Sequence, residues 1–224
     1  MPSSHYSHIS KTMELVLALQ PQSVLDIGSG FGKYGLLCRE YLDLWDGRQK
    51  YEFVKQIDGV EVFSKYITPI HKFVYNNIYN DDIIKLVYKL DFKYDLVLLI
   101  DVLEHIEKNE GRSLLKILVN KNKGILIGTP KNPSQQKDVF DNIYETHQSK
   151  WLKEDFETIG ECFFIPDCLS FIVYITRDKT SIDNLRKRIR RLREYRSFSF
   201  IKKLKKILAH IPGCVRLYNQ IKKW

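Results

Sequence analysis

Glycines occupy every second position at Gly28, Gly30 and Gly32, directly after the apolar run 24–27. The apolar run is typical of a buried strand, and glycines there let the backbone turn sharply and approach a ligand closely. The residues from Lys33 onward predict a helix, whose first amides favour electron-rich ligand groups. A strand, a glycine loop and a helix in this order predict a nucleotide-type binding corner at the carboxyl end of a sheet.

A second group of reactive side chains follows the apolar run 94–100, where Asp101, Glu104 and His105 are spaced at i, i+3 and i+4. If the chain turns helically there, this spacing places two carboxylates and an imidazole on one face. Another histidine, His147, precedes Trp151 and the next predicted helix. Side chains of these types suit acid–base chemistry.

Two familiar nucleotide motifs fit the glycine loop poorly. A phosphate-binding P-loop is excluded, because Ile27 stands where its first glycine should be and Tyr34 where it needs Ser or Thr. The dinucleotide fingerprint Gly-x-Gly-x-x-Gly matches at Gly30, Gly32 and Gly35, but it begins two residues too late after the strand.

The segment 24–32, Val-Leu-Asp-Ile-Gly-Ser-Gly-Phe-Gly, closely resembles the first motif of class I S-adenosylmethionine-dependent methyltransferases. The resemblance extends over about residues 20–176. It implies a Rossmann-like α/β fold that binds S-adenosylmethionine. In that family, Asp26 would order the loop and the amino-acid end of the cofactor, and the cofactor would lie against Gly28, Ser29, Gly30 and Gly32.

Apolar, β-rich runs alternate with helical patterns as far as residue 176, which predicts a parallel sheet covered on both faces. The last two strand candidates are joined by only four residues, which forces an antiparallel pair. With the resemblance, this predicts a mostly parallel seven-stranded sheet with a terminal antiparallel hairpin. Candidate strands lie at 23–27, 55–62, 73–79, 94–100, 123–129, 161–165 and 170–176, and candidate helices at 9–19, 33–45, 64–71, 81–90, 106–120 and 149–160.

Two acidic positions are candidates for holding an adenosine. Glu61 follows the second candidate strand, where the resemblance implies a carboxylate that accepts from two ribose hydroxyls. Asp58 competes for this role, but it falls within the apolar run. After the third candidate strand, the resemblance places Asp82 against the adenine amino group, and we expect Asp81 to cap the following helix.

The Asp-x-x-Glu-His segment and the later histidine also resemble two metal-assisted O-methyltransferase groups. One comprises the type 11/12-like ubiquinone-biosynthesis enzymes, and the other the small-RNA 3′-end 2′-O-methyltransferases. The matching positions are Asp101, Glu104, His105 and His147, with Asp101 where those groups commonly use Glu. The resemblance therefore implies a Mg²⁺ or another divalent cation at these four residues. The same four residues are the catalytic candidates. Asp101 is in addition a candidate for contact with the cofactor. His105 or His147 as a general base, and purely structural roles, stay open.

The charge of the chain is divided unevenly. Residues 177–224 contain 16 Lys or Arg and 3 Asp or Glu, which leaves 20 basic and 24 acidic residues in 1–176. We therefore expect a methyltransferase domain at 1–176 and a basic, amphipathic helical tail at 177–224. In the tail, apolar stripes run through basic helical patterns at 181–196 and 198–211. This pattern suits an anionic membrane surface contacted through 181–224. Nucleic acid and self-packing or a homodimer remain alternatives.

The chain has no apolar run long enough for a membrane span, no signal-peptide pattern and no C-x-x-C pair. We therefore expect a cytoplasmic protein, peripheral on the inner face of a membrane if the tail binds one, with reduced thiols at Cys38, Cys162, Cys168 and Cys214. The predicted activity is O-methylation of a sugar or another small hydroxylated acceptor, such as a membrane-associated glycan or glycolipid. An RNA 2′-O-methyltransferase and a non-catalytic cofactor-binding adaptor are the alternatives.

Overall fold

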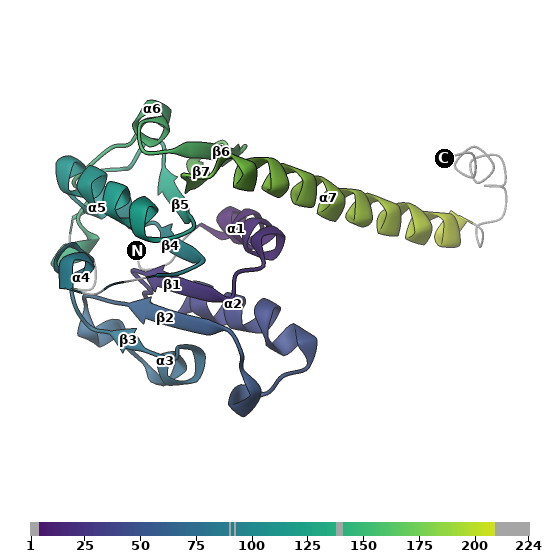
Figure 1. Cartoon of the computed structure of the whole chain (residues 1–224), viewed down its shortest axis with the longest axis horizontal. Helices are drawn as coiled ribbons and strands as arrows, with labels where there is room; N and C mark the ends of the chain where they lie inside the picture. The colour runs from purple at the N-terminus through teal and green to yellow at the C-terminus, as the bar shows by residue number, and fades with distance from the viewer. Residues whose placement is uncertain (1–4, 90, 92, 138–140, 209–224) are drawn as a thin grey trace.

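The alternating pattern of the sequence produces one seven-stranded sheet with helices on both faces (Figure 1). The computed structural model describes residues 5–208 except 90, 92 and 138–140, and of 195–208 it describes only the backbone. The strand order is β3-β2-β1-β4-β5-β7-β6, in which β7 pairs antiparallel with both neighbours and the other pairs are parallel. The strands are β1 (Ser23–Ile27), β2 (Gln56–Val60), β3 (Ile78–Tyr79), β4 (Leu96–Ile100), β5 (Ile125–Pro130), β6 (Glu161–Ile165) and β7 (Ser170–Thr176). This confirms the predicted fold class.

Each face of the sheet has its own hydrophobic core. One core joins the sheet to α4 (Ile83–Lys89), α5 (Lys108–Lys121) and α6 (Lys153–Glu157). The other joins it to α1 (Tyr6–Leu19), α2 (Lys33–Leu42), the end of α3 (Pro69–Val74) and the first part of α7 (Lys179–Leu208). Buried central strands such as β4, which is apolar at all five positions, match the expectation for a parallel sheet covered on both sides.

The chain reverses its direction of travel across the sheet at β1. This strand pairs with β2 on one side and with β4 on the other, and both pairs are parallel. The loops that leave the carboxyl ends of β1 and β4 therefore pass to different sides, which opens a crevice between them. The glycine loop and the segment after β4 meet at this crevice.

Several element boundaries differ from the sequence expectation. Residues 73–79 do not form one strand, because α3 continues to Val74 and β3 contains only Ile78 and Tyr79. The two basic segments of the tail form one continuous helix, α7, as far as Leu208. Residues 209–224, which include Cys214, lie outside the described residues. Within the described part of the chain, no helix is both long enough and apolar enough to cross a bilayer.

The long connection between β1 and β2 is tied down by a buried arginine. Beyond α2 the chain forms two short 3₁₀ helices, η1 (Leu44–Asp46) and η2 (Lys50–Glu52), before it enters β2. Arg39 is fully buried, and its guanidinium donates to Asp43 Oδ2 at 2.6 Å and to the carbonyl oxygens of Lys55 and Val74 at 2.9 Å. The same group stacks over the Phe53 ring, 4.4 Å from its centroid. This arginine thus joins α2, the connection and the end of α3.

We expect Arg39→Met to lower the free energy of unfolding by about 3–5 kcal/mol, because it leaves the Asp43 carboxylate buried and without its charge partner. Urea denaturation followed by circular dichroism measures this loss. The control is Arg48→Met, whose pair with Asp46 is exposed, and we expect it to change stability by less than about 1 kcal/mol. Equal effects of the two substitutions would show that the buried pair does not hold the connection.

Candidate active site

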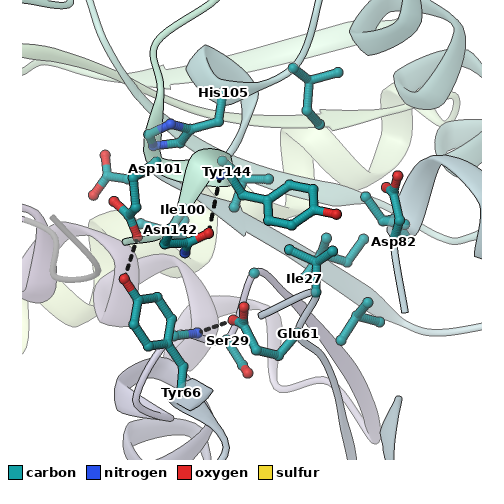
Figure 2. Close-up of a pocket in the computed structure, with 18 of the residues that line it drawn as sticks. Ile27, Ser29, Glu61, Tyr66, Asp82, Ile100, Asp101, His105, Asn142 and Tyr144 are labelled. Carbon is teal, nitrogen blue, oxygen red and sulfur yellow. Dashed lines mark hydrogen bonds between the residues drawn. The ribbon is translucent and has the colours of Figure 1, made fainter. Parts of the chain in front are cut away.

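The crevice at the end of β1 contains a pocket of about 940 Å³, counted out to its open mouth. Figure 2 shows Asp101 and Asp82 on opposite sides of the pocket and Glu61 beside the glycine loop. Of the residues predicted from the sequence, the lining contains Gly28, Ser29, Gly30, Glu61, Asp82, Asp101 and His105; Asp26, Gly32, Glu104 and His147 lie outside it.

Asp26 lies beneath the glycine loop, where it fixes the start of α2. Its buried Oδ2 accepts hydrogen bonds from the Gly35 amide at 3.0 Å and from the Tyr75 hydroxyl at 2.6 Å. Burial raises the pKa of Asp26 to about 6, although both hydrogen bonds oppose the shift. A Cβ at Gly35 would lie 2.3 Å from the Tyr75 hydroxyl oxygen, so only glycine admits this ring. Asp26 therefore orders the loop from below without touching the pocket.

Glu61 supports the loop from the side of β2. Its Oε2 accepts from the Gly30 amide at 2.8 Å, and its Oε1 accepts from the Phe63 amide at 2.9 Å. Burial raises the pKa of Glu61 to about 7 against these two bonds. The competing carboxylate, Asp58, points elsewhere: it is buried within β2 and accepts from the Tyr94 hydroxyl at 2.6 Å. Of the two acids, Glu61 alone lines the pocket.

His71 is a third support of the loop that the sequence reasoning missed. It is fully buried at the end of the first turn of α3, and its Nδ1 accepts from the Thr68 amide at 3.0 Å. This bond leaves the proton on Nε2, which donates to the Gly30 carbonyl oxygen at 3.0 Å. Burial lowers the pKa of His71, which favours this neutral form. The Thr-Pro-x-His pattern at 68–71 is a helix-start signal that could have identified this residue.

Asp101 does not share a helical face with Glu104 and His105, contrary to the sequence expectation. Its amide still pairs with the Gly128 carbonyl oxygen at 2.8 Å, and its φ of 55° then turns the chain into the left-handed region. The 3₁₀ helix η4 therefore begins only at Leu103. Asp101 remains in the pocket wall, where its Oδ2 is buried without a hydrogen-bond partner. A donor on a bound ligand would satisfy that oxygen.

The structure does bring Glu104, His105 and His147 together. One ligand atom from each lies within 4.8 Å of the others, and Asp101 is not a member of this group. Glu104 is buried behind the pocket wall, where its Oε2 accepts from the Thr129 hydroxyl at 2.9 Å. Burial, and secondly the charge of Asp101, raise the pKa of Glu104 to about 8.

The two histidines of this group are held by backbone carbonyl oxygens. The Nδ1 atom of His105 lies 3.3 Å from the Thr146 oxygen, and that of His147 lies 2.6 Å from the Ser134 oxygen. These contacts place the proton on Nδ1 and leave Nε2 as the lone-pair nitrogen, the arrangement found in metal-binding and proton-accepting histidines. Burial, and secondly His147, lower the pKa of His105, so its imidazole is neutral at physiological pH.

At the opposite side of the pocket, Asp82 takes the capping role that was expected of Asp81. Helix α4 begins at Ile83, two residues after the start of the candidate helix 81–90, so Asp82 and not Asp81 occupies the cap position. Its Oδ1 accepts from the Ile84 amide at 2.9 Å, while Asp81 accepts from the Asp82 amide at 2.8 Å. Both acids line the pocket, so capping does not remove Asp82 from the site.

The loop after β5 covers the pocket with residues that carry no sequence motif. Asn142, Tyr144 and Glu145 line it together with Tyr66, which precedes α3. The Tyr66 hydroxyl donates to Glu145 Oε1 at 3.1 Å across 79 positions of the chain, and the Asn142 side chain accepts from the Tyr144 amide (Figure 2). His147, in the same segment, is the one residue of this loop that the sequence analysis named as a site candidate.

Comparison with solved structures identifies the fold. The N-terminal domain of EvdMO1, solved with SAH and D-fucose, superposes with a TM-score of 0.55 at 18% identity, covering 78% of this chain and 84% of that one. An O-methyltransferase family protein from Burkholderia thailandensis gives 0.53 at 12% identity, over 76% and 57% of the two chains. The methyltransferase domain of bacterial CtHen1 gives 0.50 at 16% identity, over 76% and 97%. The chain therefore has the class I methyltransferase fold.

Sequence comparison adds one family. The model described as mitochondrial small ribosomal subunit Rsm22 matches residues 5–149, which contain the glycine loop, Glu61, Asp101 and both clustered histidines. No curated protein sequence gives a significant match. The matched segment ends before β6, β7 and α7.

The raised pKa of Asp26 makes stability depend on pH in a defined direction. The carboxyl ionises near its ordinary value of 3.8 in the unfolded chain and near 6 in the folded one. Between these values the folded state holds the extra proton, so stability falls as pH rises. We expect Asp26→Asn to remove this component, and urea denaturation at intervals from pH 4 to 7 measures it as a relative gain of about 3 kcal/mol for the variant. A constant difference between variant and wild type across this range would contradict the buried, proton-holding carboxyl.

Proposed function

The chain belongs to the Rsm22 family, and from this premise and its fold we propose that it transfers a methyl group from S-adenosylmethionine to a hydroxyl group of a sugar ring. One observation carries the proposal: the glycine loop, the acid after β2 and the imidazole after β4 line the same pocket. A cofactor bound on the loop would lie beside a neutral histidine that can accept a proton.

The pocket offers a complementary group for each part of the cofactor. The loop from Gly28 to Gly30 lets the ligand approach the backbone, and a side chain at Gly28 would meet Val102 at 2.6 Å. In this proposal Glu61 accepts from the ribose hydroxyls and Asp82 from the adenine amino group, because both acids line the pocket. Asp101 Oδ2, which is buried without a partner, is placed to accept from the ammonium group of the methionine part. These residues fit the cofactor.

The transfer itself requires positioning and the removal of one proton. The sulfonium of S-adenosylmethionine is already activated, so most of the catalysis consists in holding the acceptor oxygen in line with the methyl carbon. The hydroxyl proton must leave as the new C–O bond forms. His105 lines the pocket with a lowered pKa, and Thr146 fixes its tautomer, so its Nε2 is the proton acceptor of this proposal.

The clustered side chains also fit a divalent cation. Glu104, His105 and His147 have converging ligand atoms, and Nδ1 of each histidine lies against a backbone carbonyl oxygen. A metal ion held there would supply a lowered pKa for a nearby hydroxyl. Asp101 stands apart from this group, so the set that fits contains three residues and not the four expected from the sequence.

Two sources of sugar hydroxyl fit this chemistry. One is a small sugar or glycan, which suits a pocket covered by the loop after β5. The other is the ribose of RNA, which the family match favours because the family is described as a ribosomal subunit. The test is incubation with methyl-labelled S-adenosylmethionine and fractionated cell extract. Label in the glycan or in the RNA fraction identifies the source, whereas cofactor binding without label in any fraction would indicate a non-catalytic adaptor.

We expect His105→Ala to reduce the rate of methyl transfer by about 10²–10⁴-fold, because the hydroxyl loses its proton acceptor. Calorimetry should show S-adenosylmethionine still bound, since the loop and Glu61 are unchanged. His5→Ala, which alters an exposed histidine outside the pocket, is the control and should keep the wild-type rate. A fully active His105→Ala enzyme would exclude His105 from the reaction.

Exhaustive chelation separates the two roles of the histidine pair. If a cation is held there, we expect the rate to fall at least about tenfold and to return with Mg²⁺ or Mn²⁺. His147→Ala should then be as inactive as His105→Ala, although His147 does not line the pocket. A rate that survives chelation, together with an active His147→Ala, would contradict a metal and leave His105 as the base.

A further inference from the structure

In the first part of α7, the apolar stripe packs against the body of the protein and is buried there. Ile182, Leu185 and Ile189 are buried in the core that joins the sheet to α1, and Leu192 packs against the same core. These are the residues that gave the start of the tail its amphipathic pattern. Because they face the body, they are not available to enter a membrane.

Two arginines fix this docked part in place. Arg188 donates to the carbonyl oxygens of Ala18 and Leu19 at 3.1 and 3.3 Å, at the carboxyl end of α1. Arg193 makes two hydrogen bonds with the Glu14 carboxylate, at 2.9 and 2.8 Å. Beyond these contacts α7 runs away from the body as a single helix (Figure 1).

The opposite face of the docked part is cationic. Lys187 and Arg191 are exposed, and so are Arg186 and Arg190, one helical turn apart. The two acids of this stretch only just reach the arginines, with Asp183 at 3.4 Å from Arg186 and Glu194 at 3.5 Å from Arg190. The face therefore keeps a net positive charge.

An aromatic ring borders this cationic face. The half-buried side chain of Phe163, on the edge strand β6, lines a shallow hollow with residues of α7. These are three arginines, one acid and one apolar residue: Arg186, Ile189, Arg190, Arg193 and Glu194. Guanidinium groups next to an aromatic ring are the combination that single-stranded nucleic acid uses: arginine binds phosphate, and a base stacks on the ring.

We infer that this face of α7, formed by Arg186, Lys187, Arg190 and Arg191 with Phe163 of β6, binds single-stranded RNA. Charge without an exposed apolar stripe distinguishes an RNA-binding helix from a membrane-binding one, and the docking of Ile182, Leu185 and Ile189 produces that condition here. The surface lies outside the residues matched by the family model, and it would bind RNA whether or not that RNA is the methyl acceptor.

The test is fluorescence anisotropy of the full-length protein with a labelled single-stranded RNA of roughly 20 nucleotides, over a series of salt concentrations. The variant Lys187→Ala/Arg190→Ala/Arg191→Ala removes three charges from the face. The control Lys72→Ala/Lys85→Ala/Lys116→Ala removes three exposed charges from α3, α4 and α5. We expect the face variant to lose at least about tenfold in RNA affinity. The slope of the logarithm of the binding constant against the logarithm of the salt concentration should become less steep by about 2, while the control stays near wild type.

Phe163→Leu tests the ring separately and keeps most of its packing against the core. We expect about a fivefold or greater loss of RNA affinity with the salt dependence unchanged, because stacking releases no counterions. Circular dichroism and S-adenosylmethionine binding confirm that each variant is folded, and they keep this test separate from that of methyl transfer.

Three results would overturn the inference. The wild-type protein could fail to bind RNA, or the face and control variants could lose affinity equally. Alternatively, the face variant could lose binding to anionic phosphatidylserine vesicles while its RNA affinity stays at the wild-type value, which would assign the face to a membrane.

Discussion

The buried carboxyl of Asp26 joins three elements directly beneath the glycine loop. Asp26 lies near the end of β1, and its carboxylate accepts from the Gly35 amide in the first turn of α2 and from the Tyr75 hydroxyl at the end of α3. The glycine loop lies between these fixed points. Because Gly35 has no side chain, the Tyr75 ring can lie against α2 and reach the carboxyl. The geometry of the pocket therefore depends on a polar interaction that no solvent reaches.

The glycine loop is held by two ionisable side chains, Glu61 and His71. Burial shifts the pKa of each in the direction that favours its uncharged form. Glu61 accepts from the Gly30 amide, and His71 donates to the Gly30 carbonyl oxygen. The backbone donor and the backbone acceptor of this glycine are therefore both hydrogen-bonded. Burial raises the pKa of Glu61 and lowers that of His71. Together these neighbours hold the loop in one conformation, which reduces the ordering that a ligand must impose on it.

The pocket and the basic residues of α7 lie in different parts of the molecule. The pocket lies at the crevice beside β1, whereas the basic residues gather on α7 at the far edge of the sheet, beyond β6 and β7. The body carries a small acidic excess and the tail a large basic one. An acceptor that is itself a long polyanion would use both regions, since α7 would hold its backbone while the pocket receives one sugar. A small sugar would need only the pocket.

The local pattern of the sequence was sufficient for the fold class, the glycine loop, the acid after β2 and the antiparallel hairpin. Each depends on residue period or on short spacing within one segment. It could not place Tyr66 against Glu145 or His71 beneath Gly30, because those contacts join segments that only the packed sheet brings together. The proximity of His105 and His147 was implied only by the resemblance to metal-assisted enzymes. Nor could the local pattern show that Asp101 turns left-handed away from Glu104, since β5 determines where β4 stops pairing. The amphipathic pattern of α7 was visible in the sequence, but only the tertiary structure showed that the apolar side of its first part, as far as Leu192, faces the body.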